Sequence, residues 1–294
     1  MQFSQLYQDT VSMLKQAGID DAPVDAALLL EFCFGLTRSR LFLDGAMEVP
    51  AGELERFQAV LARRLSREPL HYITGSREFW SLDFIVSPAV LVPRPETEFV
   101  LESVLSTLKR SGYHHGPVLD MCTGSGVMAI VLARELDADK VIAVDISSEA
   151  LLIAALNIRK FGLESSVSLV CSDLFNALRA NEQYEVIVAN PPYIAEDDIA
   201  GLQAEVRDWE PFLALTGGPG GLEVIEKIAD QAYRYLVPGG WLFIEIGFDQ
   251  AEKVAALFAG HASKVYDNVG VQADWSGRPR LLQARRRGEM EWIR

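Results

Sequence analysis

Four residues in the second half of the chain, Asn190-Pro191-Pro192-Tyr193, could recognise a planar amino group. Proline has no backbone N–H, so this loop is rich in hydrogen-bond acceptors, and Pro191 pushes Asn190 away from helical geometry. The Asn190 side-chain oxygen and the Pro191 carbonyl could accept both hydrogens of an –NH2 group, while Tyr193 could stack on its flat face. A carboxylate or a hydroxyl cannot fill both bonds, so the motif favours a carboxamide or an aromatic amine.

A glycine-rich segment upstream could bind a nucleoside-type ligand. It reads Asp120-Met121-Cys122-Thr123-Gly124-Ser125-Gly126 and precedes a helical pattern. Glycines let the backbone pass close to a ligand, and the start of a helix offers free N–H groups. Asp145 ends the next β-branched run, where a carboxylate can bind ribose hydroxyls. Taken alone, the segment fits a dinucleotide or an adenosine ligand without a pyrophosphate, and a tight turn that needs glycine for packing is a third interpretation.

Both motifs depend on short strands that alternate with helical stretches from Glu96 onward. This alternation predicts an α/β fold with a doubly wound, mostly parallel, Rossmann-like sheet. Such sheets bind ligands beyond the carboxyl ends of their strands, where both motifs fall. The last two runs predict an antiparallel hairpin at the sheet edge. The predicted strands are residues 118–120, 141–144, 167–170, 186–189, 241–244, 263–266 and 280–284.

The chain before this sheet has a different character. Apolar residues recur at helical spacing in residues 3–14, 23–33 and 54–65, which predicts a small helical domain. Alternation at 84–86 and 90–92, around a Ser87-Pro88 turn, predicts a β-hairpin linker. The predicted organisation is therefore a small helical domain at 1–70, a β-hairpin linker at 71–95 and an α/β domain at 96–294, which is the candidate catalytic domain because it carries both motifs.

Composition excludes several classes of function. The 294 residues carry 27 Lys and Arg against 41 Asp and Glu, a net charge of −14. Stable nucleic-acid binding relies on Lys and Arg, so we expect none. No apolar run approaches the ~18 residues of a membrane span, and the first residues lack a secretory signal, so we expect no membrane association. Three scattered cysteines favour a reducing cytoplasm, and four histidines without ligand spacing predict no metal site.

Taken together, these segments resemble the release-factor glutamine methyltransferases, which are protein-(glutamine-N5) methyltransferases of the class I S-adenosylmethionine-dependent type. The resemblance runs from about residue 4 to residue 284. It implies a methyltransferase sheet and methylation of the side-chain amide N5 of the glutamine in the Gly-Gly-Gln loop of class I peptide chain release factors. Besides the N-terminal helices, the segments that carry it are Arg77–Leu82, Pro93–Glu98, Asp120–Gly126, Asn190–Tyr193, Asp274–Gly277 and Arg280.

The resemblance also implies roles for individual residues. Asn190 and Pro191 would be catalytic, and Asn190, Pro191, Pro192 and Tyr193 would hold the substrate glutamine. The N-terminal helices would dock the protein substrate. S-adenosyl-L-methionine, and its product S-adenosyl-L-homocysteine, would be bound by Asp120, Cys122, Thr123, Gly124, Ser125, Gly126, Asp145, Asp173, Leu174 and Asn190.

Two residues depart from the family pattern and keep alternatives open. Cys122 stands where the family usually has a glycine, and Leu174 stands where an aromatic ring could stack on adenine. Cysteine at the first position is frequent in the sister family that methylates a glutamine of a large-subunit ribosomal protein. N6-adenine methylation of nucleic acid is the alternative from another class, because an adenine amine presents the same two donors, yet it requires a basic surface. A nicotinamide dehydrogenase leaves Asn190–Tyr193 unexplained, and a non-catalytic binding module needs neither motif intact.

Overall fold

The computed structural model describes residues 1–113, 115–136, 138–259 and 264–288. They divide into two compact units, each with its own apolar core. The first unit comprises Met1–Ser76 together with Gln203–Trp209, and the second comprises the rest. The units therefore meet in sequence inside the predicted linker, and a late segment joins the first unit, whereas the predicted domains are continuous. The last residues of the predicted catalytic domain, 289–294, lie outside the described residues.

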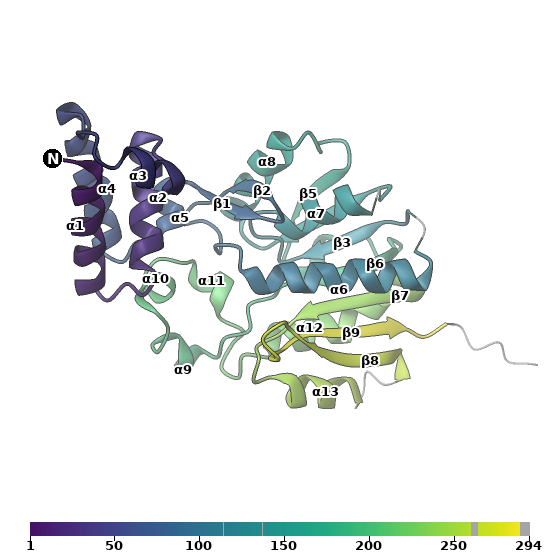
Figure 1. Ribbon diagram of the computed structural model, residues 1–294. Helices are drawn as coiled ribbons and strands as arrows, with labels where there is room; N and C mark the ends of the chain where they lie inside the picture. The colour runs from purple at the N-terminus through teal and green to yellow at the C-terminus, as the bar shows by residue number, and fades with distance from the viewer. Residues whose placement is uncertain (114, 137, 260–263, 289–294) are drawn as a thin grey trace, which may run out of the picture. The chain divides into compact units, whose positions relative to one another are not determined.

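The first unit is built from helices (Figure 1). Helices occur where the apolar spacing predicts them, at the start, near residue 28 and near residue 60, and two short helices that were not predicted follow the second and fourth. Leu14, Leu30 and Phe57 are fully buried in its core. Its elements are α1 (Phe3–Gln16), α2 (Ala22–Phe34), α3 (Arg38–Asp44), the 3₁₀ turn η1 (Ala51–Glu53), α4 (Leu54–Leu65), α5 (Leu70–Thr74) and α10 (Ala204–Arg207).

An ion-pair network holds α10 on the N-terminal helices. Glu205 accepts hydrogen bonds from Arg64 Nη2 at 3.0 Å and from Arg67 Nη2 at 2.6 Å. Arg64 also bonds Asp25 of α2 at 2.7 Å, and both of these side chains are buried. Burial pushes the pKa of Glu205 upward, but the hydrogen bonds from the two arginines outweigh it and lower that pKa. Breaking such a network would leave a buried charge unpaired, so residues 203–209 are firmly part of this unit.

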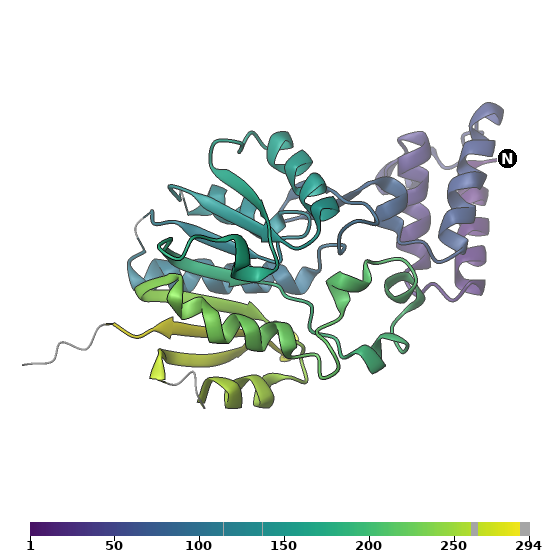
Figure 2. The same cartoon turned by 180° about the vertical axis from the view of Figure 1, so that it is seen from behind.

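The second unit contains a seven-stranded sheet in the order β5-β4-β3-β6-β7-β9-β8 (Figures 1 and 2). The strands from β5 to β7 are parallel, and β9 runs antiparallel to both of its neighbours, β7 and β8. The chain proceeds from β3 to β5 on one side and resumes with β6 on the other, so the topological switch point lies between β3 and β6. The predicted α/β fold with an antiparallel edge is confirmed. The strands are β3 (Val118–Met121), β4 (Val141–Asp145), β5 (Val167–Cys171), β6 (Tyr184–Ala189), β7 (Leu236–Glu245), β8 (Tyr266–Ala273) and β9 (Pro279–Arg286).

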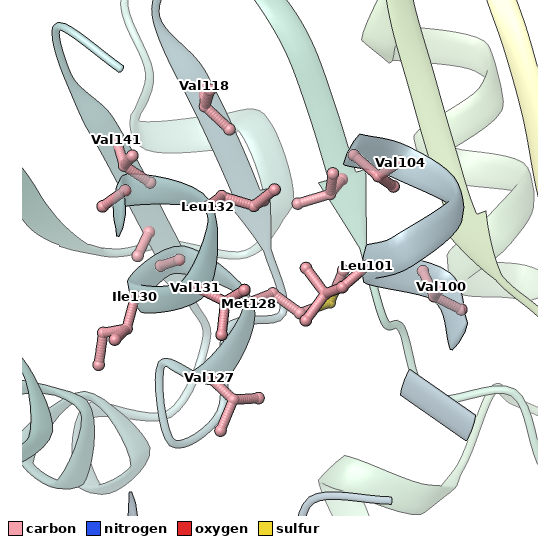
Figure 3. Packing of buried hydrophobic residues seen from close by; sticks show 14 of the residues in the cluster. Val100, Leu101, Val104, Val118, Val127, Met128, Ile130, Val131, Leu132 and Val141 are labelled. Atoms are coloured by element: carbon pink, nitrogen blue, oxygen red, sulfur yellow. The ribbon is translucent and has the colours of Figure 1, made fainter. Parts of the chain in front are cut away.

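Strand side chains alternate between two cores, one on each face of the sheet. Val118 packs with α6 and α7, whereas Leu119 packs with α12 and α13 on the face seen in Figure 2. Figure 3 shows Leu101 of α6 beside Met128 of α7 in the first core. The remaining elements are α6 (Pro95–Ser111), α7 (Val127–Glu135), α8 (Ser148–Lys160), η2 (Leu174–Ala177), α9 (Glu196–Ile199), α11 (Phe212–Leu215), α12 (Glu223–Gln231), η3 (Ala232–Arg234) and α13 (Ala251–Ala259).

The linker hairpin lies earlier in the chain than predicted. Its strands are β1 (Ser76–Phe79) and β2 (Leu82–Ile85), and residues 86–94 form no strand. The turn residues Trp80 and Ser81 both have φ of +56°, the geometry of a two-residue hairpin turn that glycine and asparagine usually supply. Neither residue signals a turn in the sequence, which explains the displaced prediction. The start of the predicted linker, up to Thr74, belongs to α5 instead.

The antiparallel edge hairpin exists, but its first strand was predicted too early. Residue 263 lies outside the described residues, and β8 begins at Tyr266, where the predicted strand ends. Asn268 has φ of +48°, and the pairing with β9 shifts register between Asp267 and Gly270. This irregularity places polar residues and a glycine inside the strand, so that it resembles a turn in sequence.

Candidate functional site

A cavity of about 490 Å³ lies at the carboxyl ends of β3, β4 and β6, beside the switch point of the sheet. Its volume falls in the range of about 300–1,000 Å³ typical of small-molecule sites. All of its lining residues belong to the second unit. The predicted site residues that line it are Cys122, Thr123, Gly124, Ser125, Asp145, Asp173, Leu174, Asn190 and Pro192.

The glycine loop between β3 and α7 is held by the Asp145 carboxylate at the end of β4. The backbone N–H of Gly124 donates to Asp145 Oδ2 at 2.8 Å, and the N–H of Ser147 donates to Oδ1 at 2.9 Å. Gly124 has φ of +56°, a conformation that glycine adopts without strain. Burial raises the pKa of Asp145, although these backbone bonds act against it. The carboxylate retains lone pairs for further donors, such as ligand hydroxyls.

Asp120 lies behind the loop and does not line the cavity. It is fully buried, and its Oδ2 accepts hydrogen bonds from the Thr123 hydroxyl at 2.6 Å and the Ala129 N–H at 3.0 Å. Desolvation raises the pKa of Asp120 to about 7, with the nearby Asp145 charge acting in the same direction. Asp120 thus ties the loop to the first turn of α7, one layer deeper than the predicted ligand contact.

Gly126 lies outside the cavity lining, and Cys122, which lines the cavity, has an unusual backbone conformation. Gly126 does not line the cavity, and a Cβ there would lie 3.3 Å from the Cβ of Ala154 in α8, so glycine serves the packing of α7 against α8. Cys122 has φ of +61°, a conformation that costs a residue other than glycine about 1–2 kcal/mol. That strain gives a physical reason why a glycine suits this position.

The remaining wall combines acidic and apolar groups. Asp173 and Leu174 follow β5, and Ile146 follows Asp145 with 54% of its surface exposed. The lining includes the cations Arg94 and Lys227, and Arg94 is paired with Glu210. Carboxylates beside apolar side chains fit an adenosine-type ligand that carries positive charge, whereas a pyrophosphate would meet few cations here.

The Asn190–Tyr193 motif follows β6 and is divided between the cavity and the interior. Asn190 and Pro192 line the cavity, whereas Pro191 and Tyr193 do not. Asn190 Nδ2 donates to Thr97 Oγ1 at 3.3 Å, and the Tyr193 hydroxyl lies close enough to the Glu245 carboxylate to lower its pKa. The Tyr193 carbonyl accepts a bond from Gln250 Nε2 at 2.8 Å. Burial raises the pKa of Tyr193, and the Glu245 charge adds to this effect.

Glu245, the last residue of β7, was not identified from the sequence. It is 1% exposed, and its Oε2 accepts a hydrogen bond from the Thr97 hydroxyl at 2.8 Å. Desolvation raises the pKa of Glu245 to about 7, while the bonds from Thr97 and Tyr193 and the charge of Arg280 act against the shift. Thr97 and Glu245 are 148 residues apart, so no local motif could mark the pair.

A short segment after α10, Pro211–Ala214, also lines the cavity and was not predicted. Phe212 and Leu213 in this segment are 56% and 61% exposed. The preceding residue, Glu210, is buried and accepts two bonds from Arg94 Nη2 at 2.7 and 2.8 Å. Burial raises the pKa of Glu210, against the charge of Arg94. The Arg94–Glu210 pair therefore anchors the segment beside the cavity.

In the part of the chain that the structure describes, no group of three or more His, Cys, Asp or Glu side chains is placed to hold a metal ion, and no helix is both long and apolar enough to cross a membrane. The three cysteines are free.

Two family models match the chain. The PrmC N-terminal domain matches residues 5–75, and the Methyltransferase small domain matches residues 97–206. The first match runs from within α1 to the end of α5, and the second includes the glycine loop, Asp145 and the Asn190–Tyr193 motif.

Similar proteins extend this match over nearly the full length of the chain. A solved methyltransferase from Pyrococcus furiosus is 18% identical with a TM-score of 0.52, covering 80% of this chain and 99% of its own, which supports the fold. The release factor glutamine methyltransferase of Koribacter versatilis (strain Ellin345) is 40% identical over 97% of this chain and 99% of its own length. That of Moorella thermoacetica (strain ATCC 39073 / JCM 9320) is 40% identical over 98% and 100%. With both units, the loop and the amide motif included in these matches, the chain belongs to the release factor glutamine methyltransferase family.

Proposed function

We propose that this protein transfers a methyl group from S-adenosyl-L-methionine to the side-chain amide N5 of the glutamine in the Gly-Gly-Gln loop of class I peptide chain release factors. One observation carries the proposal. Asn190 lines the same cavity as the glycine loop and Asp145, and its Nδ2 is bonded to Thr97, so its Oδ1 remains to accept an N–H from a substrate. The names of the relatives support the protein substrate.

The residues of the cavity fit the proposed cofactor. S-adenosyl-L-methionine supplies, when bound, a methyl group on a sulfonium, which is a good leaving group. Asp145 would bind the ribose hydroxyls, Ile146 and Leu174 would flank the adenine, and the nearby carboxylates would offset the positive charge. The proposed cofactor-binding residues are Cys122, Thr123, Gly124, Ser125, Asp145, Asp173, Leu174 and Asn190, with Asp120 and Gly126 shaping the loop.

The amide motif addresses the weak point of the reaction, because an amide nitrogen is a poor nucleophile whose lone pair is delocalised. Asn190 Oδ1 and the Pro191 carbonyl would accept the two N–H bonds of the glutamine and hold its nitrogen toward the methyl carbon. Positioning of this kind can lower a barrier by about 7–11 kcal/mol at best. The same two acceptors would stabilise the positive charge that develops on the nitrogen as the N–C bond forms and the C–S bond breaks. The nitrogen then loses one proton to water or to the Pro191 carbonyl.

The test is methyl transfer with labelled S-adenosyl-L-methionine. The protein is offered a class I release factor, its Gln→Glu variant in the Gly-Gly-Gln loop, a large-subunit ribosomal protein and double-stranded DNA in parallel. Label on the release factor that is absent from its Gln→Glu variant supports the proposal. Label on the ribosomal protein alone would assign the activity to the sister family, and label on DNA alone would assign it to adenine methylation.

A further inference from the structure

Glu245 connects the two ends of the amide motif from inside the protein. Its carboxylate accepts a hydrogen bond from the Thr97 hydroxyl, which in turn accepts one from Asn190, and the Tyr193 hydroxyl lies close enough to lower the pKa of the carboxylate. We propose that Glu245 is a positioning residue for methyl transfer, which acts through Thr97 to turn the acceptor end of the Asn190 amide toward the substrate. This inference rests on the proposed function, because it explains how that function's amide site is held.

The direction of the hydrogen bonds follows from the chemistry of the three groups. A hydroxyl has one hydrogen, and Thr97 donates it to Glu245 Oε2 at 2.8 Å. Thr97 Oγ1 then presents only lone pairs to Asn190, at 3.3 Å. If Asn190 were turned the other way, its Oδ1 would face another acceptor. The carboxylate therefore selects the orientation in which Asn190 Nδ2 points to Thr97 and Oδ1 is available to a substrate N–H.

This orientation determines which substrates the site can bind. With Oδ1 available, Asn190 accepts from a carboxamide and repels a carboxylate, so the network favours glutamine over glutamate. Without a fixed Thr97 hydroxyl, Asn190 could turn its Nδ2 toward a carboxylate and the preference would weaken. Gln250 holds the other end of the motif, since its Nε2 donates to the Tyr193 carbonyl at 2.8 Å.

The charged groups around Glu245 come from several elements. Arg280 of β9 opposes its charge and Glu96 of α6 has the same sign, while the Tyr193 and Thr97 hydroxyls complete its surroundings. Arg280 itself lies 3.5 Å from Asp274. Burial brings the pKa of Glu245 to about 7. Once protonated, the Glu245 carboxyl can donate a hydrogen bond to Thr97 Oγ1, and the Thr97 hydroxyl can then donate its own hydrogen to Asn190. The carboxylate therefore no longer selects the orientation of the Asn190 amide on the acid side of neutrality.

The decisive comparison uses Thr97→Val, which keeps the shape of threonine but removes the hydroxyl, and Thr97→Ser, which keeps the hydroxyl but removes the methyl group. Binding of the release factor and of its Gln→Glu variant is measured with S-adenosyl-L-homocysteine present, and kcat is measured in parallel. We expect Thr97→Ser to retain the preference for glutamine, and Thr97→Val to lose about tenfold in that preference and in kcat, with unchanged cofactor affinity. If the role of Thr97 were merely structural, Thr97→Val would weaken binding of the release factor and of its Gln→Glu variant equally, and the ratio of the two affinities would stay unchanged.

Glu245→Gln gives a second, independent readout in the pH profile. We expect the wild-type kcat to fall as the pH drops below about 7, and we expect this acid limb to disappear in Glu245→Gln. The acid limb should persist in the control Asp120→Asn, although the carboxyl that this variant removes has a similar pKa. A Thr97→Val enzyme with wild-type preference and kcat would overturn the inference, as would an acid limb that survives in Glu245→Gln. Wild-type enzyme that transfers no methyl group to the release factor would overturn the proposed function itself, so the two failures are distinct.

Discussion

We call residues 122–125 and Asp145, with Asp120 behind them, the glycine-loop wall of the cavity, and Asn190 and Thr97, with Glu245 behind them, the amide wall. The two walls are fixed by different kinds of hydrogen bond. In the first, the carboxylates of Asp120 and Asp145 accept backbone N–H groups at most 21 residues away. In the second, side chains bond to side chains across 93 and 148 residues. Backbone donors are present whatever the side chain, so the first wall tolerates substitution around its acids. The second wall depends on each member, since losing one leaves a buried partner unsatisfied.

The largest effect that separates the two walls should come from Asn190→Ala. Removing the acceptor that faces the substrate amide should lower kcat by about 10²–10³-fold, comparable to the loss of one group that stabilises developing charge. The affinity for S-adenosyl-L-homocysteine should fall by no more than about threefold, because Asn190 is one of several proposed cofactor contacts and the glycine-loop wall is unchanged. Calorimetry and methyl-transfer kinetics measure the two quantities, with the exposed Asn181→Ala as the matched control. An equal loss of both would show that the walls are not independent.

A second distinction concerns the buried acid of the glycine-loop wall and protein stability. The pKa of Asp120 is about 7 in the folded protein, against about 3.9 in an unfolded chain. Between these values the folded state binds more protons than the unfolded state, so the free energy of unfolding falls as the pH rises. We expect Asp120→Asn to remove about 2 kcal/mol of this decline between pH 5 and 7, measured by urea unfolding. A parallel decline in the variant would place the titration elsewhere.

How far the sequence predicts each wall follows from the same difference. The glycine loop, Asp145 and Asn190 each follow a strand that the sequence marks, and residues 122–125, Asp145 and Asn190 line the cavity. Glu245 has no such signal, because a carboxylate at the end of an apolar strand acquires its partners only when β7 and the start of α6 meet. The same applies to Phe212, which is brought to the cavity by the Arg94–Glu210 pair. The hairpin turn at Trp80 was not predicted for a local reason, because the residues with positive φ in this turn are not glycines and so give no turn signal in the sequence.

The third effect tests whether Asp145 serves the ligand as well as the loop. Asp145→Ala removes the acceptor of Gly124 and a carboxylate on the cavity wall, so we expect the affinity for S-adenosyl-L-homocysteine to fall about 10–100-fold, the usual weight of a charged hydrogen bond. The affinity for the release factor should change little. Titration calorimetry gives both values, and Asp139→Ala supplies an exposed acidic control. If Asp145→Ala bound the cofactor product normally, the carboxylate would be a loop brace alone.

The smallest effect concerns the segment Pro211–Ala214, which belongs to neither wall. Phe212 lines the cavity yet is 56% exposed, so Phe212→Ser should change the free energy of unfolding by less than about 0.5 kcal/mol. Its apolar surface covers part of the cavity, and its loss should weaken S-adenosyl-L-homocysteine binding by about two- to fivefold. Thermal unfolding without ligand and calorimetry with it separate the two effects. An unchanged affinity would confine the binding surface to the two walls, whereas a loss as large as that of Asp145→Ala would make this segment a third wall, which the half-buried Arg94–Glu210 ion pair helps to anchor.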